Sequence, residues 1–256
     1  MRLDIYLTEK KLAKSRETAQ RLIREGSVSI GGRVVTKPSF SLDESAPPEI
    51  VVSGGLKYVS RGGLKLEAAL DRFGLDVTGL DAVDIGASTG GFTDCLLQRG
   101  AGQVRCIDVG RAQLDERLAE DPRVTSFESM NARYLTPEQI GGSCELAVCD
   151  VSFISLTLIV HAVRSILAPD GKFVALIKPQ FEAGRAALDK HGIVKERAYH
   201  VGAIESVLGA ADAEGLYCEG LTVSPIEGGD GNREYLALFG ESGGFDRALI
   251  KQIVYN

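Results

Sequence analysis

Four charged side chains of this 256-residue chain lie within or directly after short apolar segments. Asp84 belongs to the segment 82–85, whereas Asp108, Asp150 and Lys178 each follow such a segment. If these segments are strands of an open α/β sheet, their carboxyl ends meet at one edge, where such sheets bind ligands. There Asp108 could accept hydrogen bonds from both hydroxyls of a ribose. Lys178 could act as a base, and the alternative is that its side chain only extends to solvent. We therefore expect a ligand site at this edge.

A glycine-rich turn follows Asp84, in the sequence Asp84-Ile-Gly86-Ala-Ser88-Thr-Gly90-Gly91-Phe92. A strand, a tight glycine turn and a helix begin the nucleotide site of many α/β sheets, because glycines let the backbone approach a ligand and the helix offers unpaired N–H groups. The spacing does not fit the G-x-G-x-x-G of dinucleotide sites. An acid followed by Gly-x-x-x-Gly is typical of S-adenosylmethionine (SAM) sites, so we expect this turn to contact SAM.

Two other interpretations of the turn stay open. Gly86-Ala-Ser88-Thr-Gly90 also matches the G-x-S-x-G of α/β-hydrolases, in which Ser88 would be the nucleophile. Asp150 with His191 or His200 would then supply the acid and the histidine of a triad. The turn could also be structural, with no ligand.

Apolar segments and helical patterns alternate after residue 55, which predicts a Rossmann-like α/β sheet. Strands are expected at residues 82–85, 103–108, 124–127, 145–153, 172–179, 216–225 and 233–239. Helices are expected after the glycine pairs 62–63 and 90–91, and at residues 156–167, 196–213 and 243–256. Asn131 follows the third strand, where it can contact an adenine. Residues 180–195 are expected to form a mobile loop that could cover a substrate.

The composition is that of a globular protein, with 44% hydrophobic and 25% charged residues. The longest apolar stretch, residues 153–168, is interrupted by His161 and Arg164, so we expect a core helix and no membrane span. The five cysteines form no C-x-x-C pair and the three histidines do not cluster. These features predict a reduced, cytoplasmic protein without a metal site.

The charge of the chain is distributed unevenly. The net charge is −6, yet residues 1–41 hold nine Lys or Arg and four acids, a net charge of +5. The remaining residues carry 20 basic and 31 acidic side chains, a net charge of −11. This asymmetry suggests a basic nucleic-acid-binding module attached to an acidic body.

The first 52 residues predict a small α+β module. Helices are expected at residues 3–12 and from the N-cap Ser15 to Gly26, followed by a hairpin at Gly31-Gly32 and a strand at residues 49–52. This order resembles the RNA-binding domain first seen in ribosomal protein S-four (αL type). We place the domain boundary between residues 55 and 56, with Gly54-Gly55 as the hinge. The side chains expected to face RNA phosphates are Arg2, Lys14, Arg16, Arg21, Arg24, Arg33 and Lys37.

The whole chain resembles the TlyA-type family, known as haemolysins and as ribosomal RNA 2′-O-methyltransferases with an FtsJ-like catalytic domain. The segments that carry the resemblance are Ser60-Arg-Gly-Gly-Leu-Lys-Leu, Asp84-Ile-Gly-Ala-Ser-Thr-Gly-Gly-Phe-Thr, Cys149-Asp-Val-Ser-Phe-Ile-Ser-Leu, Ile177-Lys-Pro-Gln-Phe-Glu and Gly229-Asp-Gly-Asn-Arg-Glu-Tyr. The resemblance implies a Rossmann-like, SAM-dependent enzyme that methylates a ribose 2′-hydroxyl, of cytidine, in ribosomal RNA or a ribosomal subunit. The short segment before the first helix resembles the members thought to modify the large-subunit RNA.

The same resemblance implies the site residues. Lys65, Asp150, Lys178 and Glu234 align with the Lys-Asp-Lys-Glu catalytic set of related 2′-O-methyltransferases. The residues expected to bind SAM are Asp84, Gly86, Ser88, Gly90, Gly91, Phe92, Asp108, Val109, Asn131 and Asp150. Besides the serine hydrolase, the alternative is a non-enzymatic, membrane-active haemolysin.

Overall fold

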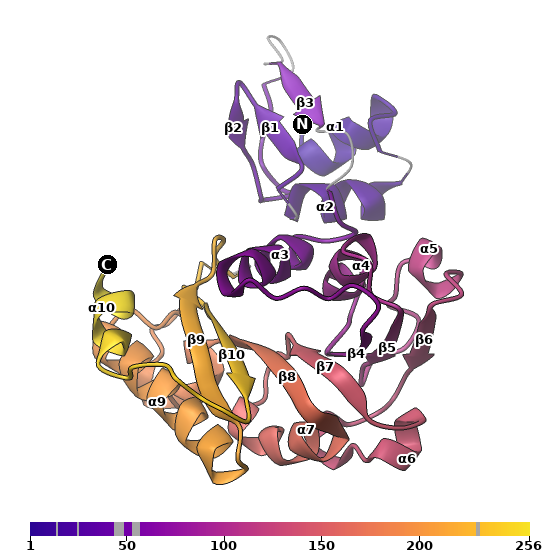
Figure 1. Ribbon diagram of the computed structural model, residues 1–256. Coiled ribbons are helices and arrows are strands. Elements are labelled where there is room, and N and C mark those ends of the chain that lie inside the picture. Colours follow the sequence, from indigo (N-terminus) through magenta and orange to yellow (C-terminus); the bar gives the residue numbers. More distant parts are fainter. Residues whose placement is uncertain (14, 25, 44–48, 53–56, 229–230) are drawn as a thin grey trace. The chain divides into compact units, whose positions relative to one another are not determined.

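The computed structural model contains two compact units, Met1–Arg61 and Gly62–Asn256 (Figure 1). The structure describes residues 1–13, 15–24, 26–43, 49–52, 57–228 and 231–256. The expected boundary between residues 55 and 56, and the hinge Gly54-Gly55, lie outside the described residues. Each unit is considered by itself.

The first unit packs two helices on a three-stranded antiparallel sheet of order β2-β1-β3. Its elements are α1 (Leu3–Glu9), α2 (Arg16–Arg24), β1 (Val28–Ile30), β2 (Arg33–Val34) and β3 (Ile50–Val52). Leu3 and Leu7 of α1 meet Ala19 and Ile23 of α2 over Val28, and all five side chains are buried. The helix–helix–hairpin order expected from the sequence is therefore confirmed.

Local chemistry explains where these elements begin and end. Ser15 Oγ accepts a hydrogen bond from Thr18 N at 3.1 Å, as an N-cap does. Gly31 and Gly32 have φ values of +55° and +77°, which the tight hairpin between β1 and β2 requires at both turn positions. The helix α1 ends at Glu9, three residues before the expected end at residue 12, because the chain then turns.

The second unit is built on a seven-stranded sheet of order β6-β5-β4-β7-β8-β10-β9. The pairs from β6 to β8 are parallel, whereas β10 is antiparallel to both of its neighbours. The bounds of the strands are β4 Asp81–Ile85, β5 Gln103–Ile107, β6 Val124–Phe127, β7 Cys144–Cys149, β8 Leu167–Ile177, β9 Tyr217–Val223 and β10 Tyr235–Gly240. This confirms the predicted Rossmann-like sheet.

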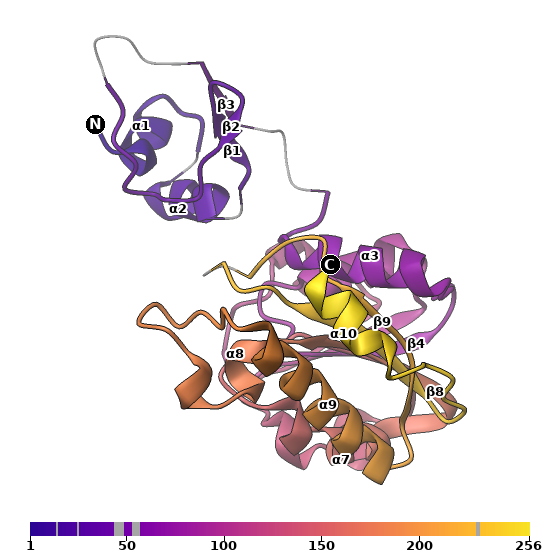
Figure 2. The same cartoon turned by 90° about the vertical axis from the view of Figure 1, so that its left-hand side faces the viewer.

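Helices cover both faces of this sheet, which is why its central strands are almost continuously buried (Figures 1 and 2). On one face lie α3 (Gly62–Phe73) and α4 (Gly91–Gln98). On the other face lie α7 (Val160–Ile166) and α9 (Arg197–Ala213), with α10 (Leu249–Tyr255) beside α9. The shorter helices are α5 Glu116–Ala119, α6 Pro137–Ile140 and α8 Pro179–Glu182, with 3-10 turns η1 Ala132–Tyr134, η2 Leu156–Leu158 and η3 Arg185–Ala187.

Three expectations about this unit need correction. The fourth strand ends at Cys149 and not at residue 153, so Asp150 is the first residue beyond it. The helix expected at residues 156–167 is divided into η2 and α7. Residues 180–195, expected to form a loop, contain most of α8 and all of η3, and Leu188 pairs with Val194 in an antiparallel bridge.

Gly86 lies where the carboxyl ends of β4 and β7 come closest. Its φ is +82°, and a Cβ atom there would lie 2.6 Å from the carbonyl oxygen of Asp150. A side chain at this position therefore collides with backbone that cannot move independently of the sheet. The glycine is required both by conformation and by space.

We predict that Gly86→Ala lowers the free energy of unfolding by about 2–4 kcal/mol, because conformational strain and collision add. Gly141→Ala is the matched control, since Gly141 has a φ of +85° but open space around its Cβ position. The control should lose only about 1–2 kcal/mol, the cost of the left-handed conformation. Denaturant titration of both variants measures the difference, and equal losses would show that the contact with Asp150 does not matter.

Candidate functional site

The sheet reverses its strand order at β4, whose neighbours are β5 on one side and β7 on the other. In open α/β sheets a crevice forms at such a reversal, outside the carboxyl ends of the strands. Here it is a cavity of about 370 Å³, within the range of ligand sites. Its lining includes six of the residues predicted to bind SAM: Gly86, Ser88, Asp108, Val109, Asn131 and Asp150.

Asp108 joins the two backbone turns at the rim of the cavity. Its Oδ2 accepts from Ser88 N at 2.8 Å, and its Oδ1 accepts from Gly110 N at 2.7 Å. Each carboxylate oxygen keeps a second lone pair for a ligand hydroxyl. The remaining lining is mainly apolar, with Ile107, Met130 and Ile159 among its residues, as a flat heterocycle requires. A nucleoside fits this set of side chains.

Asp84 does not line the cavity; it supports the helix α4. Its Oδ2 accepts from Thr93 N at 2.9 Å and from Thr93 Oγ1 at 2.7 Å. Because Gly90 precedes α4 and has no side chain, the carboxylate of Asp84 satisfies an N–H group of the first turn in place of an N-cap. Complete burial raises the pKa of Asp84 to about 7, and the charge of Asp150 adds to this effect.

Gly90, Gly91 and Phe92 also lie outside the lining of the cavity. A Cβ atom on Gly90 would collide with the side chains of Leu114 and Leu118, so this glycine makes room for apolar packing. Phe92 is buried in the core, 3% exposed. The first part of the turn, with Gly86 and Ser88, therefore faces the cavity, and the second part, from Gly90 to Phe92, packs at the start of α4.

Lys178 and Asp150 form an ion pair at the carboxyl edge of the sheet. Lys178 Nζ lies 2.6 Å from Asp150 Oδ1 and donates to Ser152 Oγ at 2.9 Å. The lysine side chain is only 10% exposed. Its amino group does not extend into solvent, so the alternative that Lys178 follows the strand only to reach water is excluded.

Lys65 and Glu234 form a second pair, from opposite ends of the unit's sequence. Lys65 Nζ donates to Glu234 Oε2 at 2.6 Å, and the side chains are 10% and 2% exposed. Glu234 directly precedes Tyr235, which pairs with Ile177 across β10 and β8, so the register places Glu234 beside Lys178. The four residues of the predicted catalytic set therefore lie at one edge of the sheet.

Phe153 was not among the predicted site residues, although it lies at the cavity and the residue is 91% exposed. Its φ is +65°, a strained conformation for a bulky residue. The ring lies 5.2 Å from that of Phe181, over which Lys178 Nζ lies at 5.9 Å. Hydropathy gave no signal for this position, because an apolar residue beside a strand is normally buried. Gln113 and Ser152 were missed as well.

The geometry does not support a serine hydrolase. Ser88 has a φ of +49°, as a nucleophile on a tight turn would, and its N–H donates to Asp108. The buried His200, however, is engaged elsewhere, with Nδ1 on the Tyr235 hydroxyl at 2.9 Å and Nε2 on the Val194 carbonyl at 2.8 Å. Burial lowers the pKa of His200, which suits this structural role. His191 is exposed and donates its backbone N–H to Asp189.

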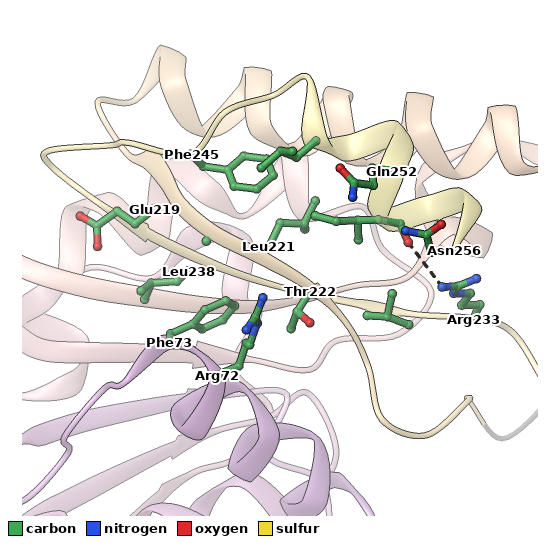
Figure 3. A pocket seen from close by; sticks show the side chains of 14 residues that line it. Arg72, Phe73, Glu219, Leu221, Thr222, Arg233, Leu238, Phe245, Gln252 and Asn256 are labelled. Atoms are coloured by element: carbon green, nitrogen blue, oxygen red, sulfur yellow. Dashed lines mark hydrogen bonds between the residues drawn. The ribbon is translucent and has the colours of Figure 1, made fainter.

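A larger cavity, of about 660 Å³, lies along the edge strand β9 between α3 and α10 (Figure 3). Phe73, Leu221 and Phe245 contribute apolar side chains to its lining, which also includes Arg72 and Arg233. It contains none of the predicted site residues. Volume alone therefore does not identify the site, whereas the convergence of charged side chains at the carboxyl edge does.

In the first unit, the structure divides the basic residues predicted to bind RNA into two groups. Arg24, Arg33 and Lys37 are exposed. Arg2 and Arg16 both bind the carboxylate of Asp4, through Arg2 Nε at 2.9 Å and Arg16 Nε at 3.1 Å. Lys14 and the side chain of Arg21 lie outside the described part of the chain.

Comparison with known proteins shows to which families the two parts of the chain are related. Residues 58–241 match the FtsJ-like methyltransferase family, and residues 1–46 match the S4 domain. YqxC of Bacillus subtilis is 47% identical over 92% of this chain and 84% of that protein. The 16S/23S rRNA (cytidine-2′-O)-methyltransferase TlyA of Mycobacterium tuberculosis is 41% identical over 91% and 87%. A solved structure of a hemolysin-type protein from Streptococcus thermophilus covers 100% of this chain and 94% of that one, with 43% identity and a TM-score of 0.79.

The fold, the site and these matches define an enzyme, a methyltransferase of the FtsJ-like class with an S4 domain. More narrowly, the chain belongs to the TlyA family. Within the described residues, no helix is long and apolar enough to cross a membrane. In the same part of the chain, His, Cys, Asp and Glu side chains form no group that could hold a metal ion.

We predict that Asp84 makes stability depend on pH. Between its unfolded pKa near 3.9 and its folded pKa of about 7, the folded state holds a proton that the unfolded state has released. The free energy of unfolding should therefore fall as the pH rises through this window, by about 1.4 kcal/mol per pH unit at most.

Asp84→Asn cannot ionise and should remove this decline, so that the variant gains stability relative to the native protein as the pH rises from 4 to 7. Denaturant titrations at half-unit intervals of pH test this. Asp170→Asn, which neutralises an exposed carboxylate, serves as the control. Parallel profiles for the native protein and Asp84→Asn would contradict the raised pKa.

Proposed function

We propose that this methyltransferase transfers a methyl group from SAM to a ribose 2′-hydroxyl of ribosomal RNA, and that Lys65, Asp150, Lys178 and Glu234 are its catalytic residues. One observation carries the proposal. Two ion pairs, Lys178–Asp150 and Lys65–Glu234, lie side by side at the carboxyl edge, and Asp150 also lines the nucleoside-sized cavity. Withdrawing charged groups from water costs free energy, and clusters of such groups are typical of functional sites.

The residues present at the cavity fit SAM. Asp108 would bind the ribose hydroxyls, and the apolar lining with Val109 and Asn131 would hold the adenine. The carboxylate of Asp150 would lie near the positive sulfur. Gly86 and Ser88 would bring backbone close to the ligand, while Asp84, Gly90, Gly91 and Phe92 support the turn from behind. When bound, SAM supplies an electrophilic methyl group on a sulfonium.

The chain's own residues would orient the acceptor and take its proton. The 2′-hydroxyl is a poor nucleophile, so its lone pair must point along the line of transfer. Lys178 Nζ would take or steer the hydroxyl proton, and the hydrogen bond to Ser152 together with the contact to Asp150 fixes where this atom lies. Lys65 and Glu234 would hold the ribose from the other side. Positioning of this kind contributes on the order of 7–11 kcal/mol at best.

Ribosomal RNA is the acceptor favoured by the relatives and by the S4 domain. The M. tuberculosis relative is named for cytidines of both the 16S and the 23S RNA. We propose cytidine as the target here and the large-subunit RNA as the first substrate to test. The exposed Phe153, whose ring lies beside that of Phe181, offers a face on which the target base can stack. An enzyme that acts on ribosomes would work in the cytoplasm.

The first test is the transfer of radiolabelled methyl from SAM to unmodified ribosomal subunits of each size. Lys178→Ala should lower turnover at least 100-fold and leave SAM binding within about twofold, because proton transfer of this kind contributes ~10²–10⁴-fold. Lys172→Ala is the matched control, a lysine of β8, the strand that Lys178 follows, which pairs with Glu219 away from the cavity that Asp150 lines. Normal methylation by Lys178→Ala would overturn the catalytic assignment.

A second test addresses the cofactor. Asp108→Ala should weaken SAM binding about tenfold or more, since a carboxylate that accepts two hydroxyls is lost. Calorimetric titration with SAM measures the affinity, and thermal melting without SAM shows whether the variant is folded. A folded Asp108→Ala protein with native SAM affinity would exclude the proposed ribose contact.

A further inference from the structure

Among the residues of the S4 domain that the structure describes, one carboxylate is completely buried, that of Asp4 in the first turn of α1. It accepts hydrogen bonds from Arg2 Nε at 2.9 Å and Nη2 at 3.0 Å, and from Arg16 Nε at 3.1 Å. Gln20 Nε2 donates at 2.8 Å, and the backbone N–H of Ile5 donates at 3.1 Å. A single acid thus joins the chain before α1 to two turns of α2.

These contacts leave part of each guanidinium available. Arg2 uses one edge of its guanidinium on Asp4, and Arg16 uses only Nε. The two side chains remain 45% and 55% exposed. Their other N–H groups make no hydrogen bond within the described part of the chain. Two arginines on one carboxylate therefore present unused donors to solvent from neighbouring positions.

The carboxylate stays ionised in this environment. The side-chain hydrogen bond from Arg2 is the main reason why the pKa of Asp4 lies well below its usual range, and Gln20 and Arg16 add to it. The group of Asp4, Arg2 and Arg16 therefore carries a net charge of +1 at neutral pH. Charge alone gives no reason for an acid here, because an acid weakens the attraction for RNA.

We propose that Asp4 is a positioning residue that holds Arg2 and Arg16 together as one receptor for an RNA phosphate. This inference rests on the proposed function, because it takes the substrate to be RNA. Arginine recognises phosphate through a rigid fork of donors, so two forks fixed on one carboxylate lose little freedom when the phosphate binds. Asp4 contacts no RNA itself; it acts through the two arginines.

The proposal and simple electrostatics predict opposite signs for Asp4→Asn. If only net charge matters, removal of an acid tightens RNA binding. If Asp4 orients the arginines, the variant binds RNA about tenfold more weakly. Glu17→Gln is the matched control, because Glu17 is an exposed acid in the first turn of α2 and its loss changes the net charge equally.

The experiment measures the affinity of the full chain for isolated small and large ribosomal subunits at several salt concentrations. We expect Asp4→Asn to weaken binding with a shallower salt dependence, since phosphate contacts are lost, and Glu17→Gln to bind as well as the native protein or better. Binding by Asp4→Asn as tight as that of Glu17→Gln would overturn the proposal.

A second pair of variants keeps the test valid if Asp4→Asn fails to fold. Arg16→Lys retains the charge but lacks the Nε donor, whereas Arg117→Lys makes the same change at an exposed arginine of the larger unit that also binds a carboxylate, that of Asp115. We expect a loss of affinity of about three- to tenfold for Arg16→Lys and less than twofold for Arg117→Lys. Equal losses would overturn the proposal. SAM affinity reports on the integrity of the larger unit throughout.

Measurements on the wild-type protein distinguish a failure of the proposed role of Asp4 from a failure of the proposed function. Binding and methylation of a subunit by the wild-type chain, with no difference between Asp4→Asn and Glu17→Gln, would retain the proposed function and remove the role of Asp4. Absence of binding to either subunit by the wild-type chain would overturn both.

Discussion

Charged groups that are withdrawn from water must meet an opposite charge, and this requirement organises the carboxyl edge of the larger unit. Lys65 and Glu234 are 169 positions apart in the sequence, yet their side chains lie 2.6 Å apart and are almost completely buried. Removing one partner of such a pair costs about 3–5 kcal/mol, because the other charge is left uncompensated. The pair therefore joins the first turn of α3 to the start of β10. A side chain held in this way has one position and not many, which is what an in-line transfer needs.

The direction of β10 explains how a residue so late in the chain reaches this edge. Asp108, Asp150 and Lys178 follow the carboxyl ends of parallel strands. Glu234 instead precedes its strand, and only an antiparallel strand begins where the parallel strands end. Three of these residues therefore reach this edge because they follow the end of a parallel strand, and Glu234 reaches it because it precedes the start of an antiparallel strand. The reversal of strand order at β4 adds the cavity beside them, and Asp150 belongs both to the lining of this cavity and to the ion pair with Lys178.

Much of this arrangement could be predicted from local sequence, and the exceptions have physical causes. Apolar segments located the strands, and the glycines at residues 31 and 32 located the hairpin, because both signals depend on near neighbours. Asp84, Gly86 and Phe92 belong to one motif, but of these three only Gly86 lines the cavity. The strand alternates its faces and the chain curves at the turn, so the side chains of Asp84 and Phe92 point elsewhere. Phe153 could not be identified as exposed, since a backbone conformation with positive φ leaves no trace in hydropathy. The ordered segment Leu188–Val194 depends on the distant Asn232, which accepts from Val194 N and donates to the Gly192 carbonyl.

The same requirement for charge pairing serves a different purpose in the S4 domain. At the carboxyl edge of the larger unit, each buried lysine meets its own carboxylate, and the pairs are nearly neutral. Around Asp4, one carboxylate meets two arginines, so the group remains positive and faces solvent. A neutral pair can hold a small acceptor without attracting distant anions, whereas an excess of positive charge attracts RNA before any contact forms. The net charge of +5 over residues 1–41, against −11 for the rest, extends this difference to the whole chain. Under the proposed function, attraction of RNA and methyl transfer would belong to different units, and the acidic body would disfavour RNA that the basic unit does not hold.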